Sequence, residues 1–277
     1  MEKSKAYDLP VRIFHWVFAL LFVTSFLIAK LIDDESSLYA YHMLSGILMV
    51  SIVLLRILWG IWGSKTARFG SFKLKPSELI AYFVSVHKNN VTRYLGHNPA
   101  SSYAAILMML FAFGLGTTGL LMSLKINKHF FKEVHELIAN GFLIVVLLHI
   151  SGVILHQVRN KDGMILSMVN GKKAKTNSES DIESNHVFVG VFLVGFIVAM
   201  GSFLLTHFER DTGKLSAFGL HLQLGENEHE EHGENHQKHS NKIGSHDDDD
   251  DDDKNNERKE DRDDHDEDQN DDLEDRD

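Results

Sequence analysis

Four histidines of this chain lie inside apolar segments long enough to cross a membrane. An ionisable side chain within a bilayer is costly, so it usually binds or conducts something. Two of the four, His135 and His149, share one segment. At a rise of about 1.5 Å and a turn of about 100° per residue, they lie about 21 Å apart and within about 40° of one helix face. One helix can therefore present an imidazole near each membrane surface, and the full set is His15, His42, His135 and His149.

Five apolar stretches must position these histidines. Each has about the 20 residues that cross a hydrocarbon core. The first is not a secretory signal, because it is long and no small-residue cleavage site follows it. The expected spans are Val11–Ile32, Tyr41–Trp62, Tyr103–Leu124, Val134–Val158 and Val187–Leu205.

Lysines and arginines predict the orientation of the spans. They concentrate in the N-terminus and in the connections 63–102 and 159–186, whereas Asp33, Asp34 and Glu35 mark the first loop on the other side. Cytoplasmic loops carry the excess of Lys and Arg. The expected protein crosses the membrane five times, with a cytoplasmic N-terminus and a C-terminal tail outside the cytoplasm.

This topology sorts the histidines by depth and predicts two haem sites. His15 and His149 share the cytoplasmic depth, and His42 and His135 share the outer one. An iron with imidazoles on both axial positions has no open site, so it exchanges electrons without making bonds to a substrate. The chain has no cysteine, which excludes covalent c-type haem, thiolate clusters and disulfides. We therefore expect two non-covalent bis-histidine b-type haems.

Arginines near the cytoplasmic depth are candidates to bind the haem propionates. Arg12 lies one turn before His15, and Arg56 lies in the cytoplasmic third of the second span. A positive-inside anchor is the alternative for Arg12, and snorkelling to the interface is the alternative for Arg56.

Other motifs carry less chemistry. The stretch GLGTTG at 114–119 lies inside an apolar helix and follows no strand, so it is not a dinucleotide fingerprint. We expect its small residues to allow close approach of a helix or a macrocycle, as at Gly46, Gly141 and Gly152. His156 is expected at the inner interface and His97 is expected to cap or position the third span, while a quinone-site role for His87 or His97 remains an alternative.

Residues 6–173 resemble the bacterial cytochrome b561 family, which includes the b-type cytochrome subunits of nickel-iron hydrogenases. The resemblance implies a four-helix, dihaem, quinone-linked electron carrier, and it gives the haem-ligand role to His15, His42, His135 and His149. The stretches that carry it are YDLPVRIFHW (7–16), HMLSG (42–46), RILWGIWGS (56–64), ARF (67–69), YLGHNP (94–99), TG (118–119), HELIAN (135–140), HISGV (149–153) and NGKK (170–173).

The last third of the chain departs from this family. Residues 225–277 hold 25 Asp and Glu against 7 Lys and Arg, a composition that cannot bury a core. The segment is a hydrophilic tail that attracts a basic redox partner, or a site for a divalent metal. Imidazoles spaced three and four apart bind zinc, copper or nickel, and the tail offers His229, His232, His236 and His239.

The expected fold is an all-α integral membrane protein: a four-helix transmembrane haem-binding bundle, a fifth transmembrane helix and a disordered acidic tail. The boundaries are 1–175 for the dihaem domain, 176–210 for the linker and fifth helix, and 211–277 for the His/Asp-rich tail. The resemblance to a bacterial family places this multi-pass protein in the bacterial inner (plasma) membrane, with its N-terminus cytoplasmic and its C-terminal tail periplasmic. We expect an electron-transfer protein or oxidoreductase subunit, rather than a stand-alone enzyme, that links the quinone pool to a periplasmic c-type cytochrome or hydrogenase-like enzyme. No nucleic-acid partner is expected. The alternative is a divalent-metal transport or metal-sensing membrane protein.

Overall fold

The structure is a computed structural model that describes residues 3–88, 94, 96–174, 182, 184–217 and 219–224. Within these residues, five helices are long and apolar enough to cross a membrane, as the sequence predicted. They are α1 (Leu9–Leu31), α2 (Ala40–Trp62), α4 (Pro99–Ser123), α5 (Lys128–Asn160) and α7 (Val187–Thr206). The protein is therefore an all-α, multi-pass membrane protein.

Polar caps decide where two of these helices begin. The side chain of Asp8 accepts a hydrogen bond of 2.9 Å from the backbone N–H of Val11, and that of Asn98 accepts one of 2.8 Å from Ser101. Each cap is followed by a proline in the first turn, where a missing N–H costs nothing. Helix α4 consequently begins at Pro99, ahead of its apolar stretch.

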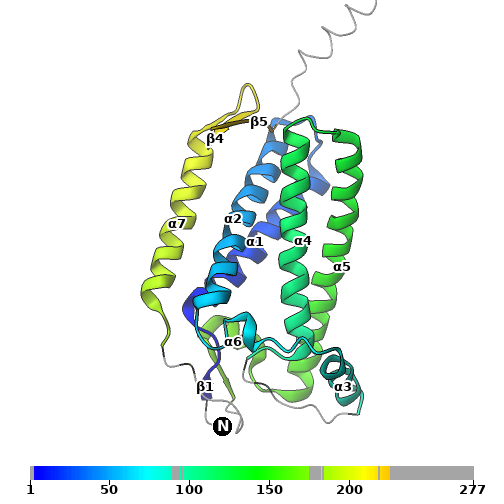
Figure 1. Cartoon of the computed structure of the whole chain (residues 1–277), viewed down its shortest axis with the longest axis vertical. Coiled ribbons are helices and arrows are strands. Elements are labelled where there is room, and N and C mark those ends of the chain that lie inside the picture. The colour runs from blue at the N-terminus through cyan, green and yellow to red at the C-terminus, as the bar shows by residue number, and fades with distance from the viewer. Residues whose placement is uncertain are drawn as a thin grey trace, which may run out of the picture. The chain divides into compact units, whose positions relative to one another are not determined.

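Helices α1, α2, α4 and α5 form the four-helix bundle, and α7 packs against α1 and α2 (Figure 1). Phe142 of α5 is fully buried at the centre of the bundle, and its ring lies 4.7 Å from that of Phe22. Helices α2 and α4 approach closely at Gly116, where an added Cβ would lie 2.1 Å from Cγ2 of Val50. The glycine-rich stretch 114–119 therefore serves helix packing, as the sequence indicated.

Short elements cover one end of the bundle, which we name the β1 end. Strand β1 (Lys3–Lys5) pairs in antiparallel fashion with β2 (Lys172–Ala174). Helices α3 (Pro76–His87) and α6 (Met164–Asn170) lie at the same end (Figure 1). The sequence predicted only connections between spans here. Helices and strands this short have too few residues to show a clear apolar period, so the sequence did not reveal them.

The opposite end, named the β5 end, carries a three-stranded sheet of β3 (Phe208–Glu209), β4 (Lys214–Ala217) and β5 (Leu220–Gln223). Leu215 of β4 is almost fully buried in one cluster with Leu204 of α7. The prediction of an unstructured tail from residue 211 was therefore wrong for residues 211–217 and 219–224. Every second side chain along β4 and β5 is apolar, and most of these side chains pack against the bundle.

The chain divides into two units, Met1–Glu228 and His229–Asp277. The fifth helix thus belongs to the same unit as the bundle, instead of forming a separate 176–210 segment. The rest of the expected tail lies outside the described residues, and with it the candidate metal ligands His229, His232, His236 and His239. Their role stays a prediction.

Candidate haem centres

His42 of α2 and His135 of α5 face each other at the β5 end. Their ring centroids lie 6.2 Å apart and their planes are inclined by 70°. A metal ion joined to one nitrogen of each ring by bonds of about 2.0–2.1 Å would leave the centroids about 6 Å apart. The spacing therefore suits one iron held between the two rings.

The second ring nitrogen of His42 is bonded to α1. Its Nδ1 lies 2.9 Å from the backbone oxygen of Ser25 and 2.9 Å from the Oγ of the same residue. A carbonyl oxygen can only accept, so Nδ1 carries the proton and Nε2 keeps a free lone pair. Metal-binding histidines are held in this way by the hydrogen bond at the other nitrogen.

His135 is held in the same manner from α4. Its Nδ1 lies 2.8 Å from Oγ1 of Thr118. That hydroxyl lies 3.0 Å from the backbone oxygens of both Gly114 and Leu115, so its proton is directed to the helix and its oxygen accepts. Nδ1 of His135 is therefore the donor, and Nε2 is again free for a metal. The sequence reading did not identify Ser25 or Thr118, although Thr118 lies in a stretch that resembles the family.

His15 of α1 and His149 of α5 lie toward the β1 end, close enough for their charges to interact. The buried Nδ1 of His15 has no hydrogen-bond partner. Its ring packs edge-on against Trp16 at 5.2 Å, and the Trp16 indole donates to the backbone oxygen of Met168 in α6. An unpaired buried nitrogen requires an explanation, and a bound group at this place supplies one.

Two glycines next to these histidines border open space. A Cβ added at Gly46, one turn after His42, or at Gly152, one turn after His149, would meet nothing within 4 Å. Gly141 differs, because its added Cβ would contact an aromatic ring of α4 at 3.4 Å. The first two glycines fit a flat macrocycle beside the helix, and Gly141 serves helix packing.

The two candidate arginines have different surroundings. Arg12 donates to the backbone oxygen of Val169 at 2.6 Å, which ties α1 to α6. Arg56 donates through Nη2 to Ala67 at 3.1 Å, and its guanidinium lies over the Phe69 ring at 5.5 Å. Its buried Nη1 has no hydrogen-bond partner. Arg56 therefore keeps a donor for an anionic group, whereas Arg12 acts as a bridge between helices.

His156, which the sequence places near the inner membrane surface, is buried within the protein. Its Nε2 lies 3.1 Å from Oδ2 of Asp162, and Nζ of Lys173 lies 3.4 Å from the same oxygen. Burial opposes ionisation of Asp162, but the hydrogen bond from His156 and the charge of Lys173 lower the pKa of this carboxyl to about 2. Burial raises the pKa of the neighbouring Tyr82 phenol to about 12. These residues come from separate segments, so no spacing in the sequence indicated the cluster.

The two histidines considered for a quinone site also differ. His87 ends α3 in an exposed position. His97 lies in the loop before α4, its ring is 4.6 Å from that of Phe72, and its buried Nδ1 has no hydrogen-bond partner.

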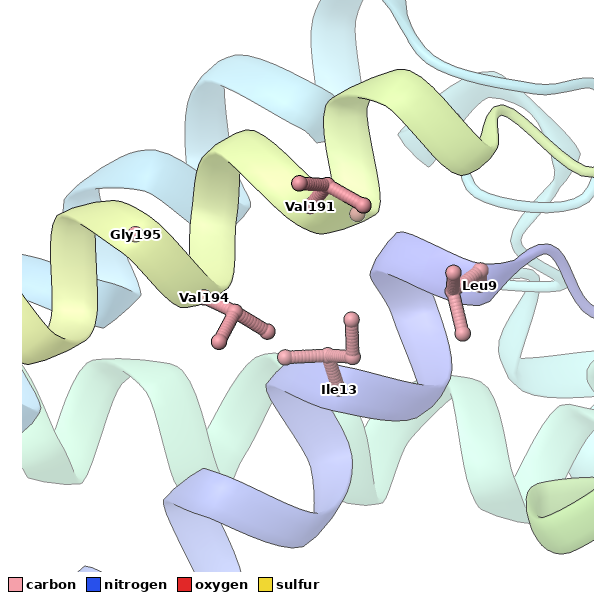
Figure 2. A pocket seen from close by; sticks show the side chains of 6 residues that line it. Leu9, Ile13, Val191, Val194 and Gly195 are labelled. Atoms are coloured by element: carbon pink, nitrogen blue, oxygen red, sulfur yellow. The ribbon is translucent and has the colours of Figure 1, made fainter.

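An apolar groove lies between α1 and α7 (Figure 2). Aliphatic side chains and glycines line it, so it offers no group for electron or proton transfer. In a membrane protein such a groove suits a hydrocarbon chain. Its residues are Leu9, Ile13, Gly190, Val191, Val194 and Gly195.

A membrane bundle that presents imidazoles with free Nε2 atoms defines a class of protein, the membrane b-type cytochromes, which carry electrons through non-covalent haem. The prokaryotic cytochrome b561 family model matches residues 6–171, and the chain belongs to this family. A probable Ni/Fe-hydrogenase B-type cytochrome subunit of Rhizobium leguminosarum bv. viciae is 23% identical to it, over 60% of this chain and 87% of that protein. No solved structure matches the chain.

Proposed function

We propose that the protein is a dihaem cytochrome of the bacterial inner membrane that passes electrons between the quinone pool and a periplasmic partner. His15 and His149 hold one haem toward the β1 end, and His42 and His135 hold the other toward the β5 end. The β1 end faces the cytoplasm, because the connections at that end carry most of the lysines and arginines of the loops.

The geometry of His42 and His135 carries this proposal. Their centroid distance of 6.2 Å suits one iron, and hydrogen bonds at both Nδ1 atoms leave both Nε2 atoms free. When bound, haem supplies an iron that cycles between ferrous and ferric states. The protein would contribute two imidazoles to each iron, and an iron held by two histidines would exchange electrons without binding a substrate. His135 and His149 both lie on α5 and would bring one haem near each membrane surface. Electrons could then pass across the membrane from one haem to the other.

The partner is proposed from the similarity to the Rhizobium protein, whose name describes a hydrogenase subunit. A hydrogenase-like enzyme or a c-type cytochrome would exchange electrons with the haem at the β5 end. The quinone would react with the other haem. Reduction of both haems by a quinol in proteoliposomes, and their reoxidation by a periplasmic partner, would measure this route.

A pyridine haemochrome assay on purified protein tests the stoichiometry. We expect two b-type haems in the wild type. His42→Ala and His135→Ala should remove mainly one haem, and His15→Ala and His149→Ala mainly the other. His129→Ala is the control, because His129 is exposed at the start of α5. A preparation without b-type haem would overturn the whole proposal, and one haem would overturn the pairing.

Ligation by two histidines also predicts a weak reaction with carbon monoxide. The dithionite-reduced protein should remain six-coordinate and low-spin, since two histidines would bind each iron. Extensive conversion to a carbon monoxide adduct would show an open iron and favour gas sensing or oxidase chemistry.

The metal-transport alternative gains no support from the part of the chain that the structure describes. No group of three or more His, Cys, Asp or Glu residues in those ranges could hold a metal ion. The contact between the rings of His42 and His135, at 6.2 Å, supports a haem site instead.

A further inference from the structure

The candidate haem ligands at the two ends of the bundle differ in what the protein offers to their second ring nitrogen. Nδ1 of His42 lies 2.9 Å from the backbone oxygen of Ser25, and Nδ1 of His135 lies 2.8 Å from Oγ1 of Thr118. The buried Nδ1 of His15 has no hydrogen-bond partner on the protein. The β5 end therefore provides an acceptor for both of its imidazoles, whereas the β1 end provides one for at most one imidazole.

The two acceptors at the β5 end are buried and held by their own helices. Thr118 of α4 is 5% exposed and Ser25 of α1 is 8% exposed. The Thr118 hydroxyl donates to backbone oxygens one turn earlier in α4 at 3.0 Å, so its oxygen stays available to accept. Hydrogen bonds in an interior of low dielectric constant are electrostatically stronger than hydrogen bonds in water. Both bonds to the imidazoles are therefore lasting consequences of helix packing.

The surroundings of His15 lack such an acceptor. The ring of Trp16 packs edge-on against the His15 ring, with the centroids 5.2 Å apart. An indole has one donor and no acceptor, and the Trp16 indole donates to the backbone oxygen of Met168 at 2.8 Å. The neighbouring aromatic ring thus positions His15 without accepting a hydrogen bond from it.

A hydrogen bond at the second nitrogen of an iron-bound imidazole depends on the charge of the iron. Ferric iron withdraws more electron density from the ring than ferrous iron does, so the N–H group becomes a stronger donor. Hydrogen bonds that involve charged groups are roughly twice as strong as those between neutral groups. Each such bond therefore stabilises the ferric state more than the ferrous state, and lowers the reduction potential of the haem.

We propose that the hydrogen bonds accepted by Ser25 and Thr118 hold the haem at the β5 end at a lower reduction potential than the haem at the β1 end. This inference rests on the proposed function, which assigns one haem to each end. Electron transfer from the β5-end haem to the β1-end haem is then downhill. In that step one ferrous iron is oxidised and one ferric iron is reduced, and the imidazoles keep their Nδ1 protons. Ser25 and Thr118 act through the histidines and are positioning residues.

Substitutions at the two acceptors should change one potential by different amounts. Thr118→Val keeps the shape of the side chain but removes the acceptor, and should raise the equilibrium constant for reduction of the β5-end haem about tenfold, which is about 59 mV for one electron. Thr118→Ser retains a hydroxyl and should keep most of the wild-type value. Ser25→Ala should cause a smaller rise than Thr118→Val, because the backbone oxygen at 2.9 Å remains.

The test is a spectropotentiometric titration of the full-length protein, with haem content measured on the same samples. The wild type should titrate in two components, and Thr118→Val should raise only the component of lower potential. Thr117→Val is the matched control, because Thr117 lies on the same helix, is exposed and donates to the backbone of α4 at 2.9 Å. This control should move neither potential.

Different results separate this inference from the proposed function. Two haems of equal potential would overturn the inference alone. So would a Thr118→Val variant in which the lower potential stays unchanged, or in which both potentials shift equally. A wild type without two b-type haems would overturn the proposed function itself. If Thr118→Val binds no haem at the β5 end, Thr118→Cys decides, because sulfur is only a weak acceptor: the lower potential should rise by a smaller amount, and an unchanged value overturns the inference.

Discussion

Nε2 of His156 lies 3.1 Å from Oδ2 of Asp162, and both side chains are almost completely buried. Lys173 joins the same carboxylate oxygen from β2 at 3.4 Å. The cluster therefore connects the end of α5, the turn before α6 and the strand after it. Buried ionic groups need all of their partners, because removal of one leaves an uncompensated charge.

Asp162→Asn should lower the free energy of unfolding by about 3–5 kcal/mol, the usual loss when one partner of a buried ion pair is removed. Thermal unfolding in detergent, followed by circular dichroism, measures it. Glu78→Gln is the control: Glu78 forms a solvent-exposed pair with Lys75 at 3.9 Å, which contributes about 1 kcal/mol or less. Equal losses in the two variants would contradict a structural role for the cluster.

The effect of Asp162 should depend on pH in one direction. Its pKa is lowered from 3.8 to about 2 in the folded protein, so its stabilising effect is complete above the unfolded value and is lost as pH falls through the folded value. The stability difference between wild type and Asp162→Asn should be constant above about pH 5 and shrink between about pH 4 and pH 2. Unfolding midpoints over this range measure it. A difference that grows on acidification would contradict the assignment.

Thr118→Val should weaken the haem at the β5 end. The substitution keeps the shape of the side chain but removes the oxygen that accepts from Nδ1 of His135 at 2.8 Å. Loss of such a partner typically costs about 10–100-fold in metal affinity or activity, so transfer of this haem to an acceptor protein should accelerate. Thr117→Val is the matched control, because Thr117 is exposed and donates to its own helix. Acceleration in both variants would point to the helix, not to His135.

Leucine at Gly46 or Gly152 should remove most of one haem and leave the helices intact. Nothing of the polypeptide lies within 4 Å of a Cβ at either position, and leucine favours a helix over glycine by about 1 kcal/mol. A loss of haem therefore reports collision with the bound group. Gly195→Leu is the control, since Gly195 is also open but lies on α7, away from the histidines. Haem content and circular dichroism measure the outcome, and full haem content in all three variants would contradict it.

Deletion of residues 225–277 should leave haem content and quinol reduction unchanged but slow electron transfer to a basic partner. The segment carries a net charge of −18, and steering by such a charge is strongest at low ionic strength. Stopped-flow transfer to a basic c-type cytochrome at low and high salt measures it.

Two results would contradict this view of the tail. An equal loss of rate at both salt concentrations would argue against steering and favour metal binding, which calorimetric titration with zinc, copper or nickel would test at His229, His232, His236 and His239. Cleavage of the tail by protease from the cytoplasmic side alone would contradict the proposed orientation.

Much of the fold was predictable because its causes are local. A segment in a bilayer must satisfy its own backbone hydrogen bonds, so each long apolar stretch becomes a helix whatever lies beside it. The spans of α1, α2, α4, α5 and α7 followed from this rule. The spacing of His135 and His149 likewise determined that one helix places an imidazole at each of two depths, since helical rise and turn are constant.

Tertiary structure alone decided which atoms meet. Ser25 and Thr118 bond the rings of His42 and His135 from other helices, and the rings of Phe72 and His97 lie 4.6 Å apart although α3 separates them in the chain. Such contacts depend on how far each helix rotates and how closely it approaches its neighbour. Side-chain volume at crossings such as Gly116 and Val50 sets both. The sequence determined the helices and the depth of their histidines, and packing between helices determined the partners that tune them.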